Sequence, residues 1–287
     1  MKTSNGNREK RNWLIAALAA CLIIPTNAIA QGLLVMPRRV IFEGTKRTQE
    51  LNLANSGMDT AKYSISIIEI RMNEDGTFDQ VSDTTAGVAS LSKNLRIFPR
   101  TVILGPNEAQ TIKVHLTNTT KLTEGEYRSH IYIKALPKEK PEGKQLKRMV
   151  SNLSLKLTPV FGLTVPVIAR VGTYAGGVTF SGVGFEMPSD SPRINLVLNR
   201  TGTMSTYGNL SIDYVPETGE PIRLEVVKGL AVYTPVKTRR LRVNLAKKEK
   251  VDFTTGKLRI IYNNLAGDRL VNTAQEEIPL QVATQPH

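Results

Sequence analysis

The chain has 287 residues, a formal net charge of +13 and a mean hydropathy of −0.18, with a single cysteine. This length is ample for two domains of ordinary size. One cysteine cannot form an internal disulfide, so apolar burial has to stabilise the fold. The basic residues are scattered and aromatic residues make up only 6% of the chain, a composition that argues against a nucleic-acid-binding surface.

Residues 1–30 have the pattern of a secretory signal peptide. Four basic residues precede an apolar stretch at residues 14–24, and the sequence AIA at residues 28–30 fits a cleavage site. The apolar stretch is shorter than the ~20 residues that span a bilayer. We therefore predict an exported protein that begins at Gln31 after cleavage. The alternative is a lipoprotein, because the sequence LAAC that ends at Cys21 resembles a lipidation box.

Short alternating runs with turn residues between them follow this leader. Tyr63, Ile65 and Ile67 alternate with other residues, and the sequence NEDG at residues 73–76 is a strong turn signal. Further strands are expected at residues 39–42, 49–54, 95–104, 112–116 and 126–136. Regular short strands separated by turns, with no amphipathic helix, predict an all-β sandwich.

The longest alternating run covers residues 153–167 and places mainly leucine, phenylalanine and valine on one face of an extended strand. Pro159 and Pro166 lack the N–H group that a central strand needs, so the run is predicted to be an edge strand. Proteins usually avoid a long apolar edge, because it recruits other chains. Here, recruitment is itself the candidate function.

A second set of strands follows the long run. These strands are expected at residues 178–185, 194–198, 208–215, 224–227, 257–262 and 277–282, with a hairpin turn at Asn263, Asn264 and Gly267. We place the domain boundary within residues 172–177. The prediction is a signal peptide at residues 1–30, a first domain at 31–172 and a second domain at 173–287.

The sequence offers little for catalysis. His115, His130 and His287 are far apart, and none stands at metal-ligand spacing. A nucleophile elbow, a phosphate-binding loop and a dinucleotide fingerprint are all missing from the sequence. We expect neither an enzyme nor a metal or other cofactor.

Several segments resemble the signatures of the periplasmic pilus-assembly chaperone family. The sequence PRRVIFEG at residues 37–44 is similar to the family's first strand, and RIFP at 96–99 with LGPNEAQT at 104–111 is similar to its middle signature. Residues 126–137 resemble its F strand, and the long alternating run lies where the family has its G strand. The resemblance covers residues 33–172 well and the second domain weakly.

The resemblance implies two immunoglobulin-like domains in an L-shaped arrangement, located in the periplasm. It also implies donor-strand complementation, in which the chaperone adds its G strand to a pilin-like subunit with an incomplete sandwich and delivers it to an outer-membrane usher. The expected donor residues are Leu155, Leu157, Phe161 and Leu163. Their alternative role is to pack in the core of their own domain, where residues from Val165 onward are expected.

The family holds the carboxylate at the subunit's C-terminus with two basic residues. Arg39 matches the first, and the fork of an arginine suits bidentate carboxylate binding, although a surface ion pair is the alternative role. The second is a lysine four residues before Arg170, a position that Pro166 occupies here. Arg38 is a candidate substitute, although as the neighbour of Arg39 it should point to the other face.

The family also has a buried Glu-Arg-Asp cluster that fixes the angle between its domains. Glu126 and Arg170 match the first two members, and Asn264 stands near the third position. An asparagine can still accept a hydrogen bond from Arg170, but it carries no charge. The resemblance therefore implies a structural role between the domains for these three residues.

A function of another class stays open. The missing lysine and the LAAC sequence favour a secreted or envelope-anchored structural protein with tandem immunoglobulin-like domains that does not act on pilins. In either case, self-association through the donor edge is a way for the free protein to cover its apolar face.

Overall fold

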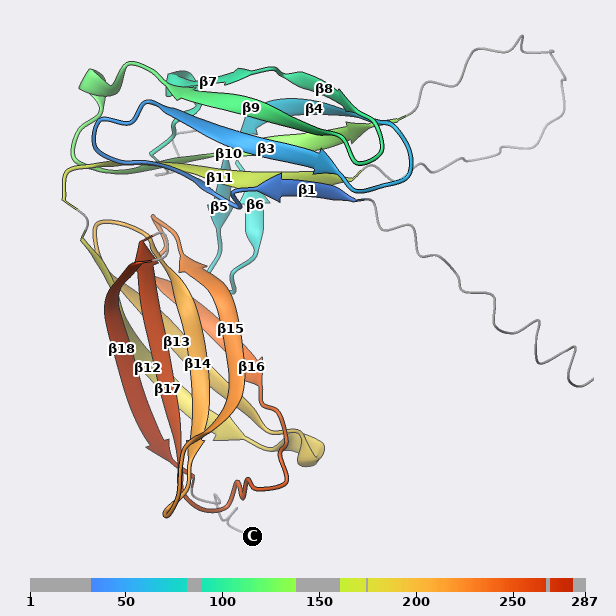
Figure 1. Cartoon of the computed structure of the whole chain (residues 1–287). Helices are drawn as coiled ribbons and strands as arrows, with labels where there is room; N and C mark the ends of the chain where they lie inside the picture. Colours follow the sequence, from blue (N-terminus) through green and yellow to red (C-terminus); the bar gives the residue numbers. More distant parts are fainter. Residues whose placement is uncertain (1–31, 82–88, 138–160, 174, 267–268, 281–287) are drawn as a thin grey trace, which may run out of the picture.

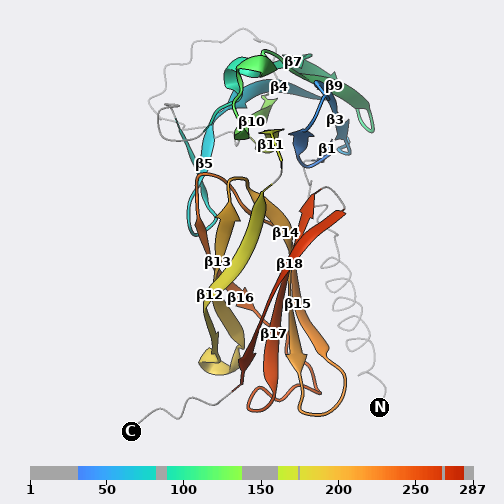
Figure 2. The same cartoon turned by 90° about the vertical axis from the view of Figure 1, so that its left-hand side faces the viewer.

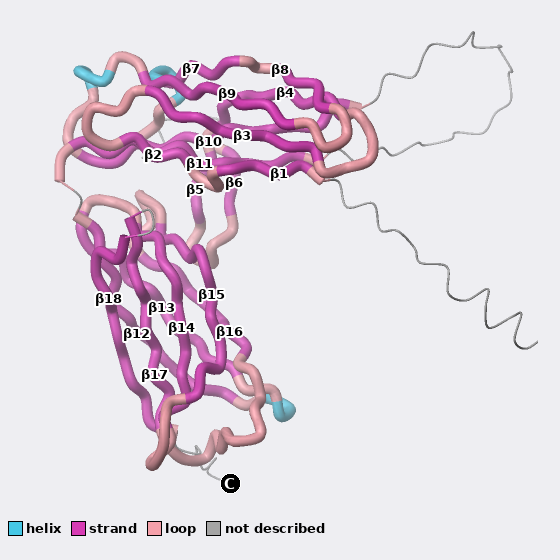
Figure 3. Tube along the Cα trace, viewed as in Figure 1, coloured by secondary structure: helices cyan, strands magenta, loops and turns pink. Residues whose placement is uncertain are grey.

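The computed structural model describes residues 32–81, 89–137, 161–173, 175–266 and 269–280. Its elements are almost all β-strands, as the alternating sequence pattern predicts. They form two immunoglobulin-like β-sandwiches, and Figure 1 shows the first lying across one end of the second, which gives the L shape. The tube in Figure 3 shows how little of the described chain is helical.

The first sandwich has a four-stranded and a five-stranded sheet. The four-stranded sheet has the order β1-β3-β9-β7, with β1 (Leu33–Met36), β3 (Thr48–Asn55), β9 (Ala109–Leu116) and β7 (Leu95–Phe98). The five-stranded sheet has the order β2-β11-β10-β4-β8, with β2 (Val40–Phe42), β11 (Gly162–Val171), β10 (Gly125–Leu136), β4 (Ala61–Ile68) and β8 (Thr101–Leu104). The short 3-10 turns η1 (Ser92–Asn94) and η2 (Thr119–Lys121) connect these strands.

Two predicted strands of this sandwich differ from the structure. The run at residues 95–104 is divided, because the chain leaves one sheet after β7, passes Pro99 and enters the other sheet as β8. A proline cannot donate to a strand ladder, and it stands where the ladder ends. The run that starts at Tyr63 is also divided: β4 ends at Ile68, and a separate hairpin of β5 (Ile70–Met72) and β6 (Phe78–Gln80) follows.

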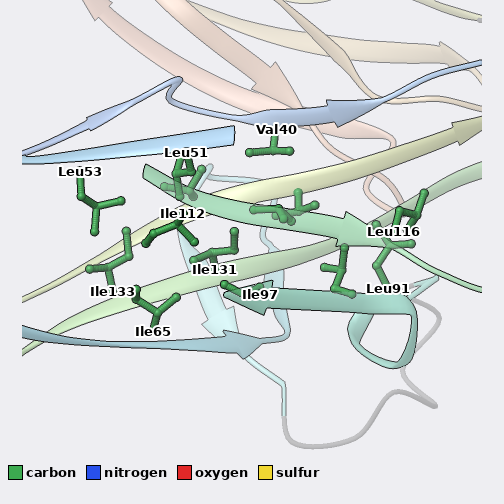
Figure 4. Close-up of a cluster of buried hydrophobic side chains, with 14 of the residues drawn as sticks. Val40, Leu51, Leu53, Ile65, Leu91, Ile97, Ile112, Leu116, Ile131 and Ile133 are labelled. Atoms are coloured by element: carbon green, nitrogen blue, oxygen red, sulfur yellow. The ribbon is translucent and has the colours of Figure 1, made fainter. Parts of the chain in front are cut away.

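The core of the first sandwich consists of the side chains that alternate inward from both sheets. Figure 4 shows isoleucines and leucines from opposing strands pointing toward one another. Leu51, Ile112 and Ile131, from three different strands, are fully buried. Full burial of a side chain of this size contributes about 1.5–3 kcal/mol, so this core stabilises the domain without a disulfide.

The second sandwich has its own core. Its sheets have the orders β12-β13-β16 and β15-β14-β17-β18. The strands are β12 (Gly176–Glu186), β13 (Arg193–Gly202), β14 (Thr206–Val215), β15 (Ile222–Val232), β16 (Thr238–Asn244), β17 (Lys257–Ala266) and β18 (Arg269–Pro279), with η3 (Pro188–Asp190) between β12 and β13. Leu198, Ile212 and Ile260 are fully buried in this second core.

The predicted hairpin turn at Asn263 and Asn264 is wrong. Both residues lie within β17, and the chain turns between Ala266 and Arg269. Asn264 is fully buried in a strand because its amide is satisfied there: Nδ2 donates to the Gly176 carbonyl oxygen at 3.1 Å, and Oδ1 accepts from the Tyr207 N–H at 3.3 Å.

Candidate functional site

Strand β11 changes its surroundings halfway along its length. It pairs antiparallel with β10 from Gly162 to Val171, but it pairs parallel with β2 only from Val167 to Ala169. In the described part of the chain, residues 162–166 therefore have a strand partner on one side only. The predicted edge strand is right for this half and wrong for Val167 and the residues after it, because β2 covers them.

The apolar face of β11 leaves the core at the same place. Val165 and Val167 are buried in the first core, as predicted for residues from Val165 onward. Leu163 is 42% exposed and Phe161 is 55% exposed. The two other expected donor residues, Leu155 and Leu157, lie outside the described residues. An apolar stripe thus runs from the core onto an open strand edge.

The outer face of the five-stranded sheet is turned toward the second domain, and we call it the junction face. The strand registers place its side chains in three rows across β2, β11 and β10. Ile41, Ile168 and Arg128 form the middle row, and Pro166 with His130 and Arg170 with Glu126 form the rows on either side of it. Arg39 and Glu43 stand two residues before and after Ile41, so on an extended chain they face the same side at the ends of β2.

Arg39 is in contact with the second domain. Its guanidinium carbon lies 3.4 Å from the centre of the Tyr207 ring, a stacked cation–π arrangement. Its Nη1 is buried without a hydrogen-bond partner in the described part of the protein. Burial lowers the pKa of Arg39, and the nearby charge of Arg170 acts in the same direction. The side chain therefore presents a held guanidinium with unused hydrogen-bonding capacity.

Pro166 lies on the same face as Arg39, where the family resemblance led us to look for a lysine. Arg38 is exposed.

A second cation of the junction face is Arg128, which the sequence prediction missed. It is 1% exposed, its guanidinium carbon lies 4.4 Å from the Tyr233 ring centre, and its Nε and Nη1 have no hydrogen-bond partner among the described residues. The alternation of Glu126, Arg128 and His130 on one face was the available signal.

Glu126 and Arg170 lie at the other end of the junction face. Arg170 Nε donates to Glu126 Oε2 at 3.1 Å, and its Nη1 donates to Glu43 Oε1 at 2.8 Å. Burial alone lowers the pKa of Arg170, but the two carboxylates outweigh it and raise that pKa. The sequence prediction also missed Glu43. This residue is four positions after Arg39 on an extended chain, so it faces the same side of the chain as Arg39.

Glu126 links the two domains. It accepts hydrogen bonds from the backbone N–H of Ser205 at 3.1 Å and from the Ser205 hydroxyl, both in the second domain. The Thr234 hydroxyl donates to it at 3.5 Å. Asn264 lies nearby in the fold, where it holds the backbone of Tyr207. A buried carboxylate with this many donors fixes one end of the junction.

An apolar cluster fills the space next to these polar groups. Met72 and Ile168 from the first domain pack with Ala231 and Tyr233 from the second, and all four are buried.

Within the described ranges, no group of three or more acidic, histidine or cysteine side chains is placed to bind a metal ion. In the same residues, no helix has the length and apolar character needed to cross a membrane.

No protein-family model and no curated protein matches this sequence. Solved structures similar to the chain include the CupB2 chaperone of Pseudomonas aeruginosa, with 12% identity, a TM-score of 0.43, and coverage of 84% of this chain and 98% of that chain. Another is from the CsuC–CsuE chaperone–tip adhesion subunit complex of Acinetobacter baumannii, with 12% identity, a TM-score of 0.43, and coverage of 87% of this chain and 98% of that chain. A third is the Escherichia coli chaperone DraB, with 12% identity, a TM-score of 0.41, and coverage of 86% of this chain and 98% of that chain. All three of these structures contain chaperones, and the second comes from Csu pili.

Proposed function

We propose that this protein is a periplasmic chaperone that binds pilus or related surface subunits by donor-strand complementation and delivers them for assembly. The observation that carries the proposal is the exposed apolar stripe at Phe161 and Leu163 on the open half of β11. An open strand edge offers backbone hydrogen bonds to a subunit that lacks a strand, and the stripe supplies side chains for the vacant pockets. Leu155 and Leu157 would extend the same stripe.

The energetics suit this role. Each large apolar side chain that moves from water into a subunit pocket contributes about 1.5–3 kcal/mol before the cost of ordering the strand. Phe161 and Leu163 have this contribution still available, because they are exposed. Val165 does not, because it is already buried in the first core. The donor segment therefore ends at Leu163 in this proposal.

Arg39 is the proposed anchor for the carboxylate at the subunit's C-terminus. Its ring contact with Tyr207 holds the guanidinium in place, and its buried Nη1 has no competing hydrogen-bond partner in the described chain. A charge-assisted hydrogen bond to a carboxylate would satisfy that N–H group. Pro166 carries no charge. In this proposal Arg39 therefore binds the carboxylate without the second basic residue, a lysine, of the family that the sequence resembles.

The remaining parts of the proposal rest on the sequence. They are export by a signal peptide cleaved after Ala30, domains at residues 31–172 and 173–287, delivery to an outer-membrane usher, and self-association of the free protein through the donor edge. The rival is a secreted or envelope-anchored structural protein with tandem immunoglobulin-like domains. Pro166 favours this rival, because it removes the second anchoring cation.

The test is co-expression with a small secreted subunit encoded near this gene, followed by measurement of how much subunit survives periplasmic proteolysis. Phe161→Asp and Arg39→Ala are each expected to abolish protection. Phe161→Asp should leave the thermal unfolding of the chaperone unchanged, because Phe161 is exposed. The thermal unfolding of Arg39→Ala is measured in parallel, because this change also removes the contact with Tyr207. Phe98→Asp and Arg100→Ala are the matched controls, at exposed positions away from β11, and should protect like the wild type. Full protection by both Phe161→Asp and Arg39→Ala would overturn the proposal.

A further inference from the structure

The β5–β6 hairpin leaves the first sandwich and reaches the second. Figure 1 shows it descending from the upper domain toward β15 and β16, and Figure 2 shows it beside the lower domain from another side. Its tip is internally braced: the Asn73 N–H donates to the Thr77 carbonyl at 2.8 Å, and the Gly76 N–H donates back to the Asn73 carbonyl at 2.9 Å. Gly76 has a φ of +85°, a backbone conformation that favours glycine.

The tip of the hairpin is bonded to the edge of the second sandwich. The Arg240 N–H in β16 donates to the Glu74 carbonyl oxygen at 2.6 Å, and Arg240 Nε lies 3.2 Å from Glu74 Oε2. Strand β16 is the last strand of the β12-β13-β16 sheet. An edge strand has backbone groups that need partners, and the hairpin supplies one of them.

The strand pair next to the turn of the hairpin packs into the domain junction. The Phe78 ring centre lies 6.3 Å from that of His130 in β10 and 6.3 Å from that of Tyr233 in the second domain. Met72, opposite Phe78 in the hairpin, is 2% exposed and belongs to the apolar cluster with Ile168 and Tyr233. The hairpin thus contacts both domains with apolar and polar groups.

Two of the attachments between the domains lie on different sheets of the second sandwich. One attachment is Glu126 with Ser205, which immediately precedes β14 in one sheet of the second sandwich. The other is the hairpin with Arg240, which lies in β16 of the opposite sheet. With a single attachment, the two domains could rotate relative to each other about that point. Two attachments on different sheets oppose that rotation.

We propose that the β5–β6 hairpin is a strut that sets the angle between the domains and so positions Tyr207 over Arg39. Tyr207 belongs to the second domain and Arg39 to the first, so their 3.4 Å contact depends on this angle. Glu74 and Phe78 are positioning residues in this arrangement. The angle-setting role stands apart from the proposed function, and only its consequence for Arg39 as an anchor rests on that function.

The experiment measures the distance distribution between two spin labels, one on each domain. The full chain carries Cys21→Ser, and labels are attached at Lys62→Cys in β4 and Lys228→Cys in β15, both exposed positions. We expect a single narrow distribution for this parent. Phe78→Ala, alone or with Glu74→Ala, is expected to widen it about twofold, because domains without a firm interface move relative to one another.

Two matched variants separate this effect from general loosening. Phe98→Ala and Glu50→Ala remove the same kinds of side chain from exposed sites away from the junction and should leave the width unchanged. Glu74→Ala alone removes an exposed ion pair with Arg240 and a hydrogen bond with Thr238, so it tests the strut without disturbing a buried group and should widen the distribution by a smaller amount. Hairpin variants with the width of the two controls would overturn the strut. That result would leave the subunit-protection test untouched, because the distance measurement involves no subunit.

Discussion

His130 is a titratable residue that the folded protein shields from water. It is 2% exposed on the junction face, and burial together with the charge of Arg128 lowers its pKa from 6.5 to about 3. Phe78 packs edge-on against its ring. The folded protein therefore holds a neutral histidine at a pH where the unfolded chain would bind a proton.

This difference predicts a pH dependence of stability. Between pH 6.5 and about 3 the unfolded state binds more protons at this site, so the free energy of unfolding falls as the pH falls through that window. One proton corresponds to a slope of at most ~1.4 kcal/mol per pH unit. Urea denaturation from pH 7 to pH 4.5 should show a steeper loss for the wild type than for His130→Gln. Equal slopes for the two proteins would contradict this account of His130.

At the level of the element, β11 combines two roles in one strand. Its C-terminal half lies between β10 and β2 and holds the first core, whereas its N-terminal half has an open edge. Neighbouring positions on the same apolar face should therefore respond very differently to a charge. Val165 is 1% exposed and Leu163 is 42% exposed.

Val165→Asp should lower the free energy of unfolding by more than ~3 kcal/mol, because it places an unpaired carboxylate in the core. Leu163→Asp should change the free energy of unfolding by less than ~1 kcal/mol, because its carboxylate stays in water. Urea denaturation of the two variants at pH 7 measures both values. A large loss of stability in Leu163→Asp would mean that β11 is an internal structural strand along its whole described length.

The period-two pattern predicted most strands, because inward-facing apolar residues on strands such as β3, β9 and β10 leave a clear alternation. It failed where burial does not follow that pattern. Strand β6 is exposed at all three residues, so this strand of the β5–β6 hairpin had no pattern of buried apolar residues. Arg128 and His130 are polar residues that the structure buries at the domain junction, so the alternation of apolar residues did not indicate their burial.

The candidate site shows the same division. The alternating run placed Phe161 and Leu163 on one apolar face, and the family resemblance then implied a donor role for them. The surroundings of Arg39 depend on Tyr207, which is 168 positions away in the sequence and meets it only through the arrangement of the domains. Ser205, the partner of Glu126 in the second domain, was missed for that reason. Glu43 was missed although it lies in the first domain with Arg170. Contacts between domains carry no local sequence period.

At the scale of the whole molecule, the two sandwiches present an open strand edge and a held arginine on one face of the first domain. The proposed function requires both to engage the same partner, with β11 as the added strand. Strand addition forms new backbone hydrogen bonds, and these protect amide protons from exchange with solvent. Residues 161–165 are the described part of the chain in which this protection should appear.

The most direct test is amide hydrogen exchange of the free chain and of its purified complex with the co-expressed subunit. The account predicts strong new protection in residues 161–165 of the complex, little change in residues 167–169, which β2 and β10 already cover, and loss of the new protection in Phe161→Asp. A stable complex in which residues 161–165 exchange as fast as in the free chain would contradict strand addition by β11.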